Sequence, residues 1–223
     1  MTVFHGIELF PRVEGDTAAI DALRGLPTSV IGDVMGGRLV GTTALRPVNR
    51  SAVTAAGNAV TVRVRAGDNL LIHKALDLLQ PGDVLVVDGE GDTTRALVGE
   101  IMMTSARVRG AVAFVMDGAI RDVDAFEEHR FPCWARGISL RGPYKDGPGS
   151  INVPVTVGGM LVRPGDVLVG DTDGVVAVPV VLAQEVAAKA RAKVAQEQET
   201  IAAILAGTYS SAWVDAALKQ KTQ

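Results

Sequence analysis

The strongest constraint on the fold lies between residues 84 and 116. Residues 84–87 are an apolar strand, a helix is expected from Thr93 or Thr94 to about Arg109, and residues 111–116 are a second apolar strand. Strand, helix and strand at this spacing predict a βαβ unit, whose two strands are parallel. The chain is therefore expected to fold as an α/β protein, with ligands at the carboxyl ends of its parallel strands.

The remaining elements follow from hydrophobic periodicity and from Gly and Pro positions. Thr28 or Ser29 is expected to cap a helix, as is Asp68, and Gly207 is expected to end a long one. The segment 141–150, rich in Gly and Pro, is expected to be a mobile loop. The predicted helices span 16–26, 28–35, 68–79, 180–206 and 212–218, and the other predicted strands span 59–65, 138–140, 152–157, 166–169 and 175–178.

Composition limits the classes of function. The chain has 223 residues, 48% hydrophobic and 21% charged, which suits one folded domain rather than a disordered chain. The net charge is −3 and no basic stripe is present, so nucleic acid is not an expected ligand. The single cysteine excludes an intrachain disulfide and fits a reducing cytoplasm. We expect no signal peptide and no membrane span, because no apolar run reaches roughly 20 residues.

One short sequence motif occurs twice in the chain. Residues 79–88 read LQPGDVLVVD, and residues 162–171 read VRPGDVLVGD. Pro-Gly-Asp makes a good turn into a buried strand, so shared turn chemistry is one explanation. A duplicated, barrel-like half is the other.

The candidate site lies at the two ends of an apolar stretch. Glu100 and Arg121 are separated by twenty residues, and Asp122 follows Arg121. Glu100 is expected in the first part of the helix or in the loop that leads into it. If the helix proper starts near Glu100, free backbone N–H groups there attract anions, and Gly99 allows a ligand to approach closely. Arg121 and Asp122 follow the next strand, so both ends should meet at one site. The alternative is an ordinary surface Arg-Asp pair at a helix start.

The residue types in this cluster suit metal chemistry on an acidic substrate. The Arg121 guanidinium can bind a substrate carboxylate through two parallel hydrogen bonds. Asp122 and Glu100 offer hard oxygen ligands of the kind that Mg²⁺ or Mn²⁺ takes, and Mg²⁺ typically keeps several waters.

Three long segments together resemble a known family. They read DVLVVDGEGDTTRALVGEIMMTSARVRGAVAFVMDGAIRDV from residue 83, KDGPGSINVPVTVGG from residue 145 and GDVLVGDTDGVVAVP from residue 165. The chain resembles the family named after the regulator of ribonuclease E activity. That family also contains class II pyruvate aldolases that act on 4-hydroxy-4-methyl-2-oxoglutarate and 4-carboxy-4-hydroxy-2-oxoadipate. Asp122 matches the aldolase branch, since the regulator branch lacks an Asp after the Arg.

The resemblance implies roles for the candidate residues. Asp122 would ligate the divalent metal, Mg²⁺ or Mn²⁺, and Glu100 would hold metal-bound waters. Arg121 would bind the pyruvyl carboxylate and keto oxygen, helped by backbone N–H groups near Gly99, Ile101 and Met102. The better-known aldolases carry Asp at the position of Glu100, which leaves the role of Glu100 open.

The resemblance also implies an architecture and an assembly. The fold would be one layered α/β/β/α domain over residues 1–223, of the swivelling-domain kind, with residues 180–223 as a helical extension against a neighbouring subunit. Trimers or hexamers would form, with sites between subunits. Glu197 of a neighbour, or less favourably Glu199, would complete the water network.

The implied function is a metal-dependent lyase. It would cleave 4-hydroxy-2-oxo dicarboxylates to pyruvate and an oxo acid, and would also decarboxylate oxaloacetate, because both reactions form a pyruvate enolate. Two alternatives stay open: a non-catalytic ribonuclease-regulator-like binding protein, and a lyase of the same fold for another 2-oxo or sugar acid.

Other reactive side chains have simpler explanations. His73 fits a packing role on an amphipathic helix, and Lys74 fits an exposed helix lysine better than a Schiff base. Cys133 fits a buried small hydrophobe. His129 is a minor candidate for substrate contact, and Lys145 is a candidate to reach a distal carboxylate.

Overall fold

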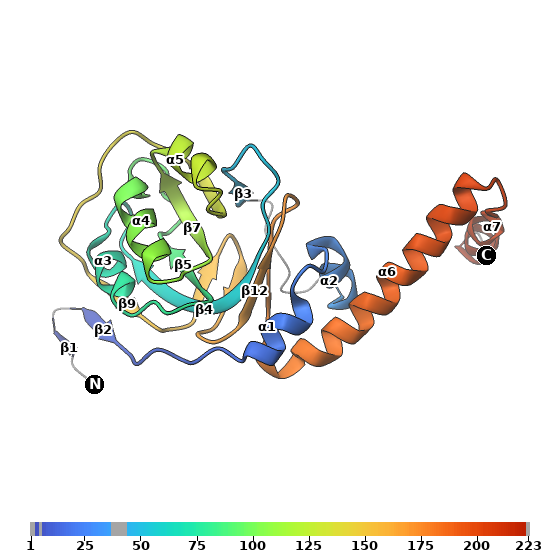
Figure 1. Ribbon diagram of the computed structural model, residues 1–223, viewed down its shortest axis with the longest axis horizontal. Helices are drawn as coiled ribbons and strands as arrows, with labels where there is room; N and C mark the ends of the chain where they lie inside the picture. The colour runs from blue at the N-terminus through green and yellow to red at the C-terminus, as the bar shows by residue number, and fades with distance from the viewer. Residues whose placement is uncertain (1–2, 5, 37–43, 222–223) are drawn as a thin grey trace.

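Three buried apolar clusters separate four layers of secondary structure in the computed structural model, which describes residues 3, 4, 6–36 and 44–221. Helices α3, α4 and α5 cover one face of the sheet, and α1, α2 and α6 lie beyond β12 on the other side (Figure 1). The predicted α/β/β/α layering is confirmed.

The elements have the following bounds. The helices are α1 (Thr17–Leu23), α2 (Thr28–Val34), α3 (Leu70–Leu76), α4 (Glu100–Val108), α5 (Val123–Glu128), the 3-10 turn η1 (Val180–Leu182), α6 (Ala183–Leu205) and α7 (Ala212–Lys221). The strands are β1 (Val3–Phe4), β2 (Ile7–Leu9), β3 (Arg46–Pro47), β4 (Ala55–Val64), β5 (Asp83–Asp88), β6 (Ala96–Val98), β7 (Ala113–Ile120), β8 (Cys133–Ile138), β9 (Gly149–Ile151), β10 (Val155–Val157), β11 (Met160–Val162), β12 (Val167–Gly170) and β13 (Val175–Val178).

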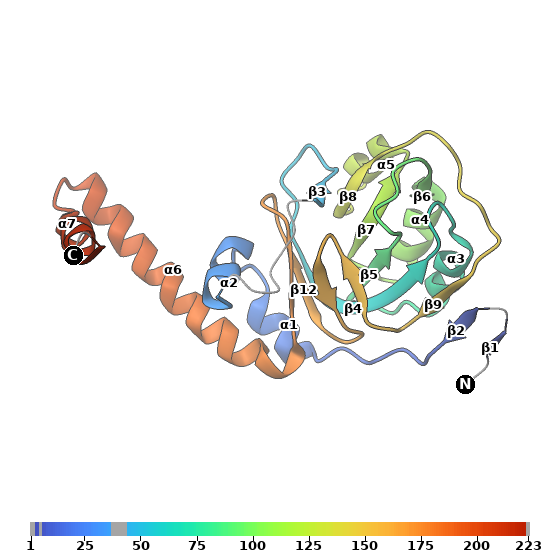
Figure 2. The ribbon, with the colours of Figure 1, turned by 180° about the vertical axis from the view of Figure 1, so that it is seen from behind.

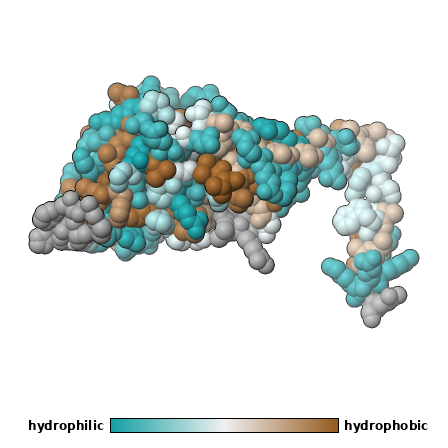
Figure 3. Space-filling view, turned by 90° about the horizontal axis from the view of Figure 1, so that it is seen from below, coloured by the Kyte–Doolittle hydropathy of each residue, from teal (hydrophilic) through white to brown (hydrophobic). Residues whose placement is uncertain are grey.

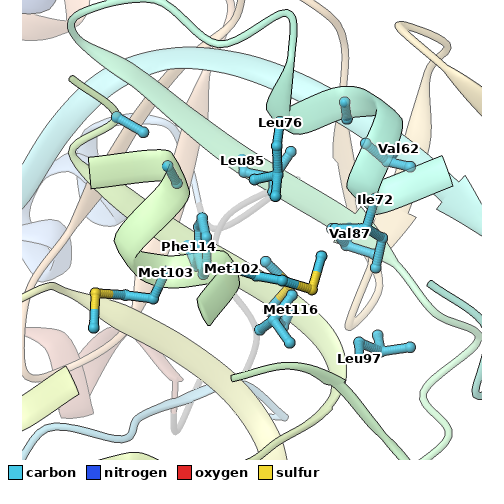
Figure 4. Close-up of a cluster of buried hydrophobic side chains, with 14 of the residues drawn as sticks. Val62, Ile72, Leu76, Leu85, Val87, Leu97, Met102, Met103, Phe114 and Met116 are labelled. Carbon is cyan, nitrogen blue, oxygen red and sulfur yellow. The ribbon is translucent and has the colours of Figure 1, made fainter. Parts of the chain in front are cut away.

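Strand alternation divides the core between two faces of the central sheet. In β5, Leu85 and Val87 point toward the helices, whereas Val84 and Val86 point toward the second strand layer. The central strands are buried on both faces, which explains their continuous apolar sequence. On the helix-facing side, Ile72 and Leu76 of α3 and Met102 of α4 belong to one buried cluster with strand residues that include Phe114 and Met116 of β7 (Figure 4).

The predicted βαβ unit is present within a parallel array. Strands β4, β5, β7 and β8 pair in this order, all in parallel. The antiparallel strands β12 and β9 pair with the first and last parts of β4. The carboxyl ends of β5 and β7 therefore lie at one edge of the sheet.

The helix predicted from Thr93 or Thr94 begins only at Glu100. The short strand β6 precedes it and pairs in parallel with the end of β7. Three buried apolar residues, Ala96, Leu97 and Val98, read as the start of a helix in the sequence. Pairing with β7 overrides that local preference, and it places the helix start at the sheet edge.

Two further boundaries differ from prediction. Residues 138–140 were expected to form a strand, but β8 ends at Ile138 and pairs along its length with β7. The residue before α2 is Pro27, whereas Thr28 or Ser29 was the predicted cap. Thr28 is instead the first residue of the helix, and its backbone N–H and hydroxyl both donate to the Asp171 carboxylate, at 2.8 and 2.6 Å. Cys133 is fully buried as predicted, and burial raises the pKa of its thiol.

The repeated Pro-Gly-Asp segments form the same turn. In each, the aspartate carboxylate accepts a hydrogen bond at 2.8 Å from a backbone N–H three residues earlier, Asp83 from Gln80 and Asp166 from Arg163. The strands that follow flank β4 on its two sides. The two segments therefore share their turn chemistry and a β4 neighbour.

The C-terminal helices extend away from the layered body. The buried residues of α6 lie between Ala183 and Ala190, and its second half has none. Figure 2 shows this half and α7 standing clear of the other elements, and Figure 3 shows apolar and polar surface interspersed along them. Within the described residues, no helix has both the length and the apolar composition required to span a membrane.

A buried ion pair anchors the N-terminal segment to β5. Arg12 donates to both oxygens of Asp83, at 2.8 and 2.6 Å, and the Asp83 side chain is fully buried. The hydrogen bond to Asp83 raises the pKa of the Arg12 guanidinium.

Arg12→Met should lower the free energy of unfolding by about 3 kcal/mol, because it leaves a buried carboxylate without its cation. Arg24→Met is the matched control, since Arg24 pairs with Asp21 on the exposed face of α1, and it should cost less than about 1 kcal/mol. Urea denaturation measures both, and equal losses would contradict the assignment.

Candidate functional site

The two ends of the apolar stretch meet through one hydrogen bond. The backbone N–H of Glu100 donates to Asp122 Oδ2 at 3.0 Å. Beside this bond, the N–H of Arg121, the residue before Asp122, donates to the carbonyl of Val98, two residues before Glu100, at 3.0 Å, which continues the pairing of β6 with β7. The structure therefore brings the Glu100 backbone to Arg121 and Asp122, so the two ends meet as the spacing predicted.

Gly99 is required here because of space. Its backbone is extended, with φ −153°, so any residue could adopt it. A Cβ at this position would overlap Asp122 Oδ2 and would lie 3.0 Å from Arg121 Cγ. Only glycine lets the start of α4 approach the Arg-Asp pair so closely.

Asp122 is held in a backbone conformation that is uncommon for a residue other than glycine. It sits before α5 with φ 58° and ψ 41°, in the left-handed region. Its side chain is 43% exposed, and Arg121 Nε lies 3.7 Å from Oδ2. Within the described part of the chain, no donor contacts Oδ1. One carboxylate oxygen is therefore fixed and the other is available to a ligand.

These groups open into a pocket of about 120 Å³, which is room for roughly four water molecules. One wall comes from β6, the start of α4 and the end of β7. The other comes from α3 and the loop after β8. The lining residues are Asn69, His73, Ala96, Leu97, Val98, Gly99, Ile101, Met102, Arg121, Asp122, Pro143 and Lys145.

The loop expected to be mobile is tied to the body by a buried carboxylate. Asp68 Oδ2 accepts from the backbone N–H groups of Asp146 and Gly147, at 2.8 and 3.0 Å, and the Asp68 side chain is fully buried. The Tyr144 N–H donates to the Gly67 carbonyl at 2.8 Å, and the Tyr144 carbonyl accepts from the Asn69 N–H at 3.0 Å. Lys145 is thus carried on a fixed segment.

Asn69 is a pocket residue that the sequence did not reveal. It is 3% exposed, its Nδ2 donates to the Leu97 carbonyl at 2.9 Å, and its Oδ1 accepts no hydrogen bond. His73, one turn later on α3, lines the same pocket rather than only packing. Partial burial lowers the pKa of His73, and the positive charge of Lys145 lowers it further. The imidazole is therefore neutral at neutral pH.

The side chain of Glu100 is exposed and does not line this pocket in the single chain. Glu197 and Glu199 lie on the second half of α6, where Glu197 is 3.8 Å from Lys193 of the same helix. Neither lines the pocket. Among the described residues, no group of three or more His, Cys, Asp or Glu side chains is placed to enclose a metal.

A hydrated cation on one carboxylate remains compatible with this donor set. Asp122 Oδ1 is a hard oxygen with no competing donor, and Mg²⁺ needs only one or two carboxylates beside its waters. The α4 N-terminus and Arg121 attract anions in the same pocket. The site can therefore bind a small acid and a cation side by side.

Gly99→Ala should lower the free energy of unfolding by about 1–3 kcal/mol, because the new methyl group displaces the Asp122 carboxylate from the Glu100 N–H. Gly142→Ala is the control, since its Cβ would lie 3.6 Å from Arg121 Nη1, an ordinary contact, and it should change stability by less than about 0.5 kcal/mol. Denaturation measures both; a Gly99→Ala protein of unchanged stability would refute the close approach.

Comparison with known proteins shows which proteins the chain resembles. A protein of Halalkalibacterium halodurans, named provisionally as a 4-hydroxy-4-methyl-2-oxoglutarate aldolase, is 41% identical over 179 residues, which cover 80% of this chain and 85% of that protein. An uncharacterized protein from Pseudomonas syringae pv. tomato has a similar solved structure, with a TM-score of 0.77, 26% identity and coverage of 88% of this chain and 96% of that one.

A further solved structure is similar in fold. The solved structure of Streptomyces coelicolor RraAS2, described as an unusual member of the RNase ES inhibitor RraA family, matches with a TM-score of 0.73 and 26% identity, and covers 84% of this chain and 98% of that one. The family model described as RraA-like, Aldolase/RraA, matches residues 21–177. The chain therefore belongs to the RraA-like, Aldolase/RraA family.

Proposed function

We propose that this protein is a divalent-metal-dependent aldolase. It cleaves 4-hydroxy-2-oxo dicarboxylates, of the 4-hydroxy-4-methyl-2-oxoglutarate type, to pyruvate and a second oxo acid, and it also decarboxylates oxaloacetate. The observation that carries the proposal is the Asp122 carboxylate beside Arg121. Its Oδ2 accepts from the Glu100 N–H, and its Oδ1 has no donor among the described residues. The aldolase name of the Halalkalibacterium halodurans relative supports it.

Different residues bind the pyruvyl unit and the cation. Arg121 and the N–H groups at the start of α4, near Gly99, Ile101 and Met102, bind the carboxylate and keto oxygen of the pyruvyl unit. Asp122 holds the cation, Mg²⁺ or Mn²⁺, through Oδ1. When bound, the cation supplies Lewis acidity that stabilises the negative charge developing on the pyruvyl unit as the C–C bond breaks.

The size of the pocket fits this substrate class. A volume of about 120 Å³ is of the order of a small organic acid. Glu100 is exposed on the first turn of α4, so its carboxylate can face waters of the cation without occupying the pocket.

A non-catalytic regulator of a ribonuclease is the second candidate, favoured by the similarity to Streptomyces coelicolor RraAS2. Asp122 separates the two, since the regulator branch lacks an Asp after the Arg. The regulator function would be supported if a ribonuclease co-purified with the protein and no divalent cation bound.

Asp122→Ala should reduce the turnover number for pyruvate release from oxaloacetate by about 100-fold or more in the presence of Mg²⁺ or Mn²⁺. Asp124→Ala is the control, because Asp124 lies on the exposed side of α5 and pairs with Arg50, and it should retain activity. Lactate dehydrogenase coupling measures pyruvate, with chelation as the metal-free reference. Metal-dependent turnover by Asp122→Ala would disprove the proposal.

The proposed assembly is a homotrimer or homohexamer in which α6 of one subunit completes the site of another. The second half of α6 and the start of α7 expose apolar side chains outside the body. Such surface is typical of a subunit contact. These side chains are Ile201, Ile204, Leu205 and Trp213.

Mixing two inactive variants tests the shared site. If Asp122 and Glu197 of different subunits form one site, co-refolded Asp122→Ala and Glu197→Ala chains should recover activity in about a quarter of the sites, from random pairing. Glu199→Ala should be active alone. No recovery, with each variant inactive and assembled, would place Asp122 and Glu197 in the same subunit's site or in none.

A further inference from the structure

The Arg121 side chain lies in a slot between two glycine backbones. A Cβ added at Gly99 would lie 3.0 Å from Arg121 Cγ and 3.2 Å from Nε, and one added at Gly142 would lie 3.6 Å from Nη1. The Gly99 wall belongs to the start of α4, which follows β6. The Gly142 wall belongs to the loop after β8. The guanidinium is therefore confined by two segments that are distant in the chain.

Packing, rather than hydrogen bonding, confines this guanidinium. Within the described residues, no protein group accepts a hydrogen bond from the Arg121 guanidinium, and its ion pair joins Nε to Asp122 Oδ2 at 3.7 Å. The side chain is 44% exposed. Its donors are therefore available to a ligand, but an arginine without fixed acceptors loses rotamer freedom when it binds one. A rigid slot reduces this loss.

Arg95 fixes the Gly142 wall directly. Its Nη1 donates to the Gly142 carbonyl at 2.6 Å. The next residue adds a second bond to the same loop, since the Ala96 N–H donates to the Arg141 carbonyl at 2.9 Å. Ala96 belongs to β6, the strand that leads to Gly99. Both walls of the slot are therefore attached to β6 or to the residue before it.

An aromatic ring sets the direction of the Arg95 side chain. The guanidinium carbon of Arg95 lies 4.0 Å from the Tyr144 ring centroid, a distance at which the face of the ring attracts the cation. Tyr144 is itself fixed, because its N–H donates to the Gly67 carbonyl at 2.8 Å and its carbonyl accepts from the Asn69 N–H at 3.0 Å. Neither Arg95 nor Tyr144 lines the pocket, so any effect of theirs on a ligand is transmitted through other residues.

We infer that Arg95, held by the ring of Tyr144, is a positioning residue for Arg121. Arg95 fixes the Gly142 backbone as one wall of the slot, and the slot presents the Arg121 guanidinium to a carboxylate in an orientation already suited to binding. The inference rests on the proposed function for the role of Arg121 as the group that binds the acid. It adds two residues outside the pocket on which the affinity for a small carboxylate depends.

Oxalate binding measures the contribution of Arg95. Calorimetry with Mg²⁺ present should show that Arg95→Met weakens oxalate binding about fivefold, as expected when one side chain must be ordered on binding. Tyr144→Leu should weaken it to a similar extent, whereas Tyr144→Phe keeps the ring and should bind oxalate as tightly as the wild-type protein. Unchanged affinity in Arg95→Met, or the same loss in Tyr144→Phe as in Tyr144→Leu, would overturn the inference.

Arg141→Met is the matched control for charge. Arg141 precedes Gly142 and is exposed, and among the residues that the structure describes no group accepts a hydrogen bond from its guanidinium. This variant removes one positive charge from the same loop and leaves the slot in place, so oxalate affinity should change by less than about twofold. A loss as large as that in Arg95→Met would show that charge rather than position is responsible, and would refute the inference.

Oxaloacetate kinetics separate positioning from a loss of folded protein. Arg121 binds the substrate both before and during the reaction, so a less ordered Arg121 in Arg95→Met should raise KM about fivefold and leave kcat within about twofold. A merely structural defect would reduce the fraction of active protein, which lowers kcat at unchanged KM. That result would contradict the positioning role.

Crystal structures without ligand decide the inference independently of the proposed function. The Arg121 side chain should occupy the slot in the wild-type protein and should spread over more than one conformer in Arg95→Met. A single, unchanged Arg121 conformer in Arg95→Met would overturn the inference. If the wild-type protein neither bound oxalate nor released pyruvate from oxaloacetate, the proposed function would be refuted, and the comparison of conformers would still decide on Arg95.

Discussion

The hydrogen bond from the Glu100 N–H to the Asp122 carboxylate holds the site together. It joins the first residue of α4 to the residue that follows β7 and Arg121, so one contact fixes a helix start and a strand end. Three local features make it available: the pairing of β6 with β7, the missing side chain at Gly99, and the left-handed backbone of Asp122. Together they leave Asp122 Oδ1 without a hydrogen-bond donor among the described residues.

The site combines attractions of opposite sign within a small volume. The start of α4 and Arg121 favour an anion, whereas the free oxygen of Asp122 favours a cation. A small acid that chelates a hydrated metal satisfies both at once. On the other wall, Lys145 adds a second positive charge to the lining of the pocket.

The sequence was sufficient for the framework of the fold and for one half of the site. Alternating burial in the strands follows from the apolar runs at residues 84–87 and 111–116, and the distance from Glu100 to Arg121 fits one helix and one strand. Strand β6 was missed because three apolar residues carry no period of their own, and only pairing with β7 makes them a strand.

The other half of the site depends on long-range contacts that leave no local signal. Asp68 reads as an ordinary helix cap, and it does accept from the Leu70 N–H at 2.9 Å. Its second oxygen instead fixes a loop nearly eighty residues away, which brings Lys145 to the pocket. Asn69 reads as one more polar residue at a helix start, and its unmet Oδ1 becomes visible only once the surrounding side chains are placed.

The most direct test of the central claim is a crystal structure of the protein with Mn²⁺ and oxalate, a mimic of the pyruvate enolate, recorded with anomalous scattering. The account predicts an anomalous peak within coordination distance of Asp122 Oδ1, with oxalate between the cation and the Arg121 guanidinium. A cation bound elsewhere, or oxalate bound with Asp122 directed away from it, would contradict the account.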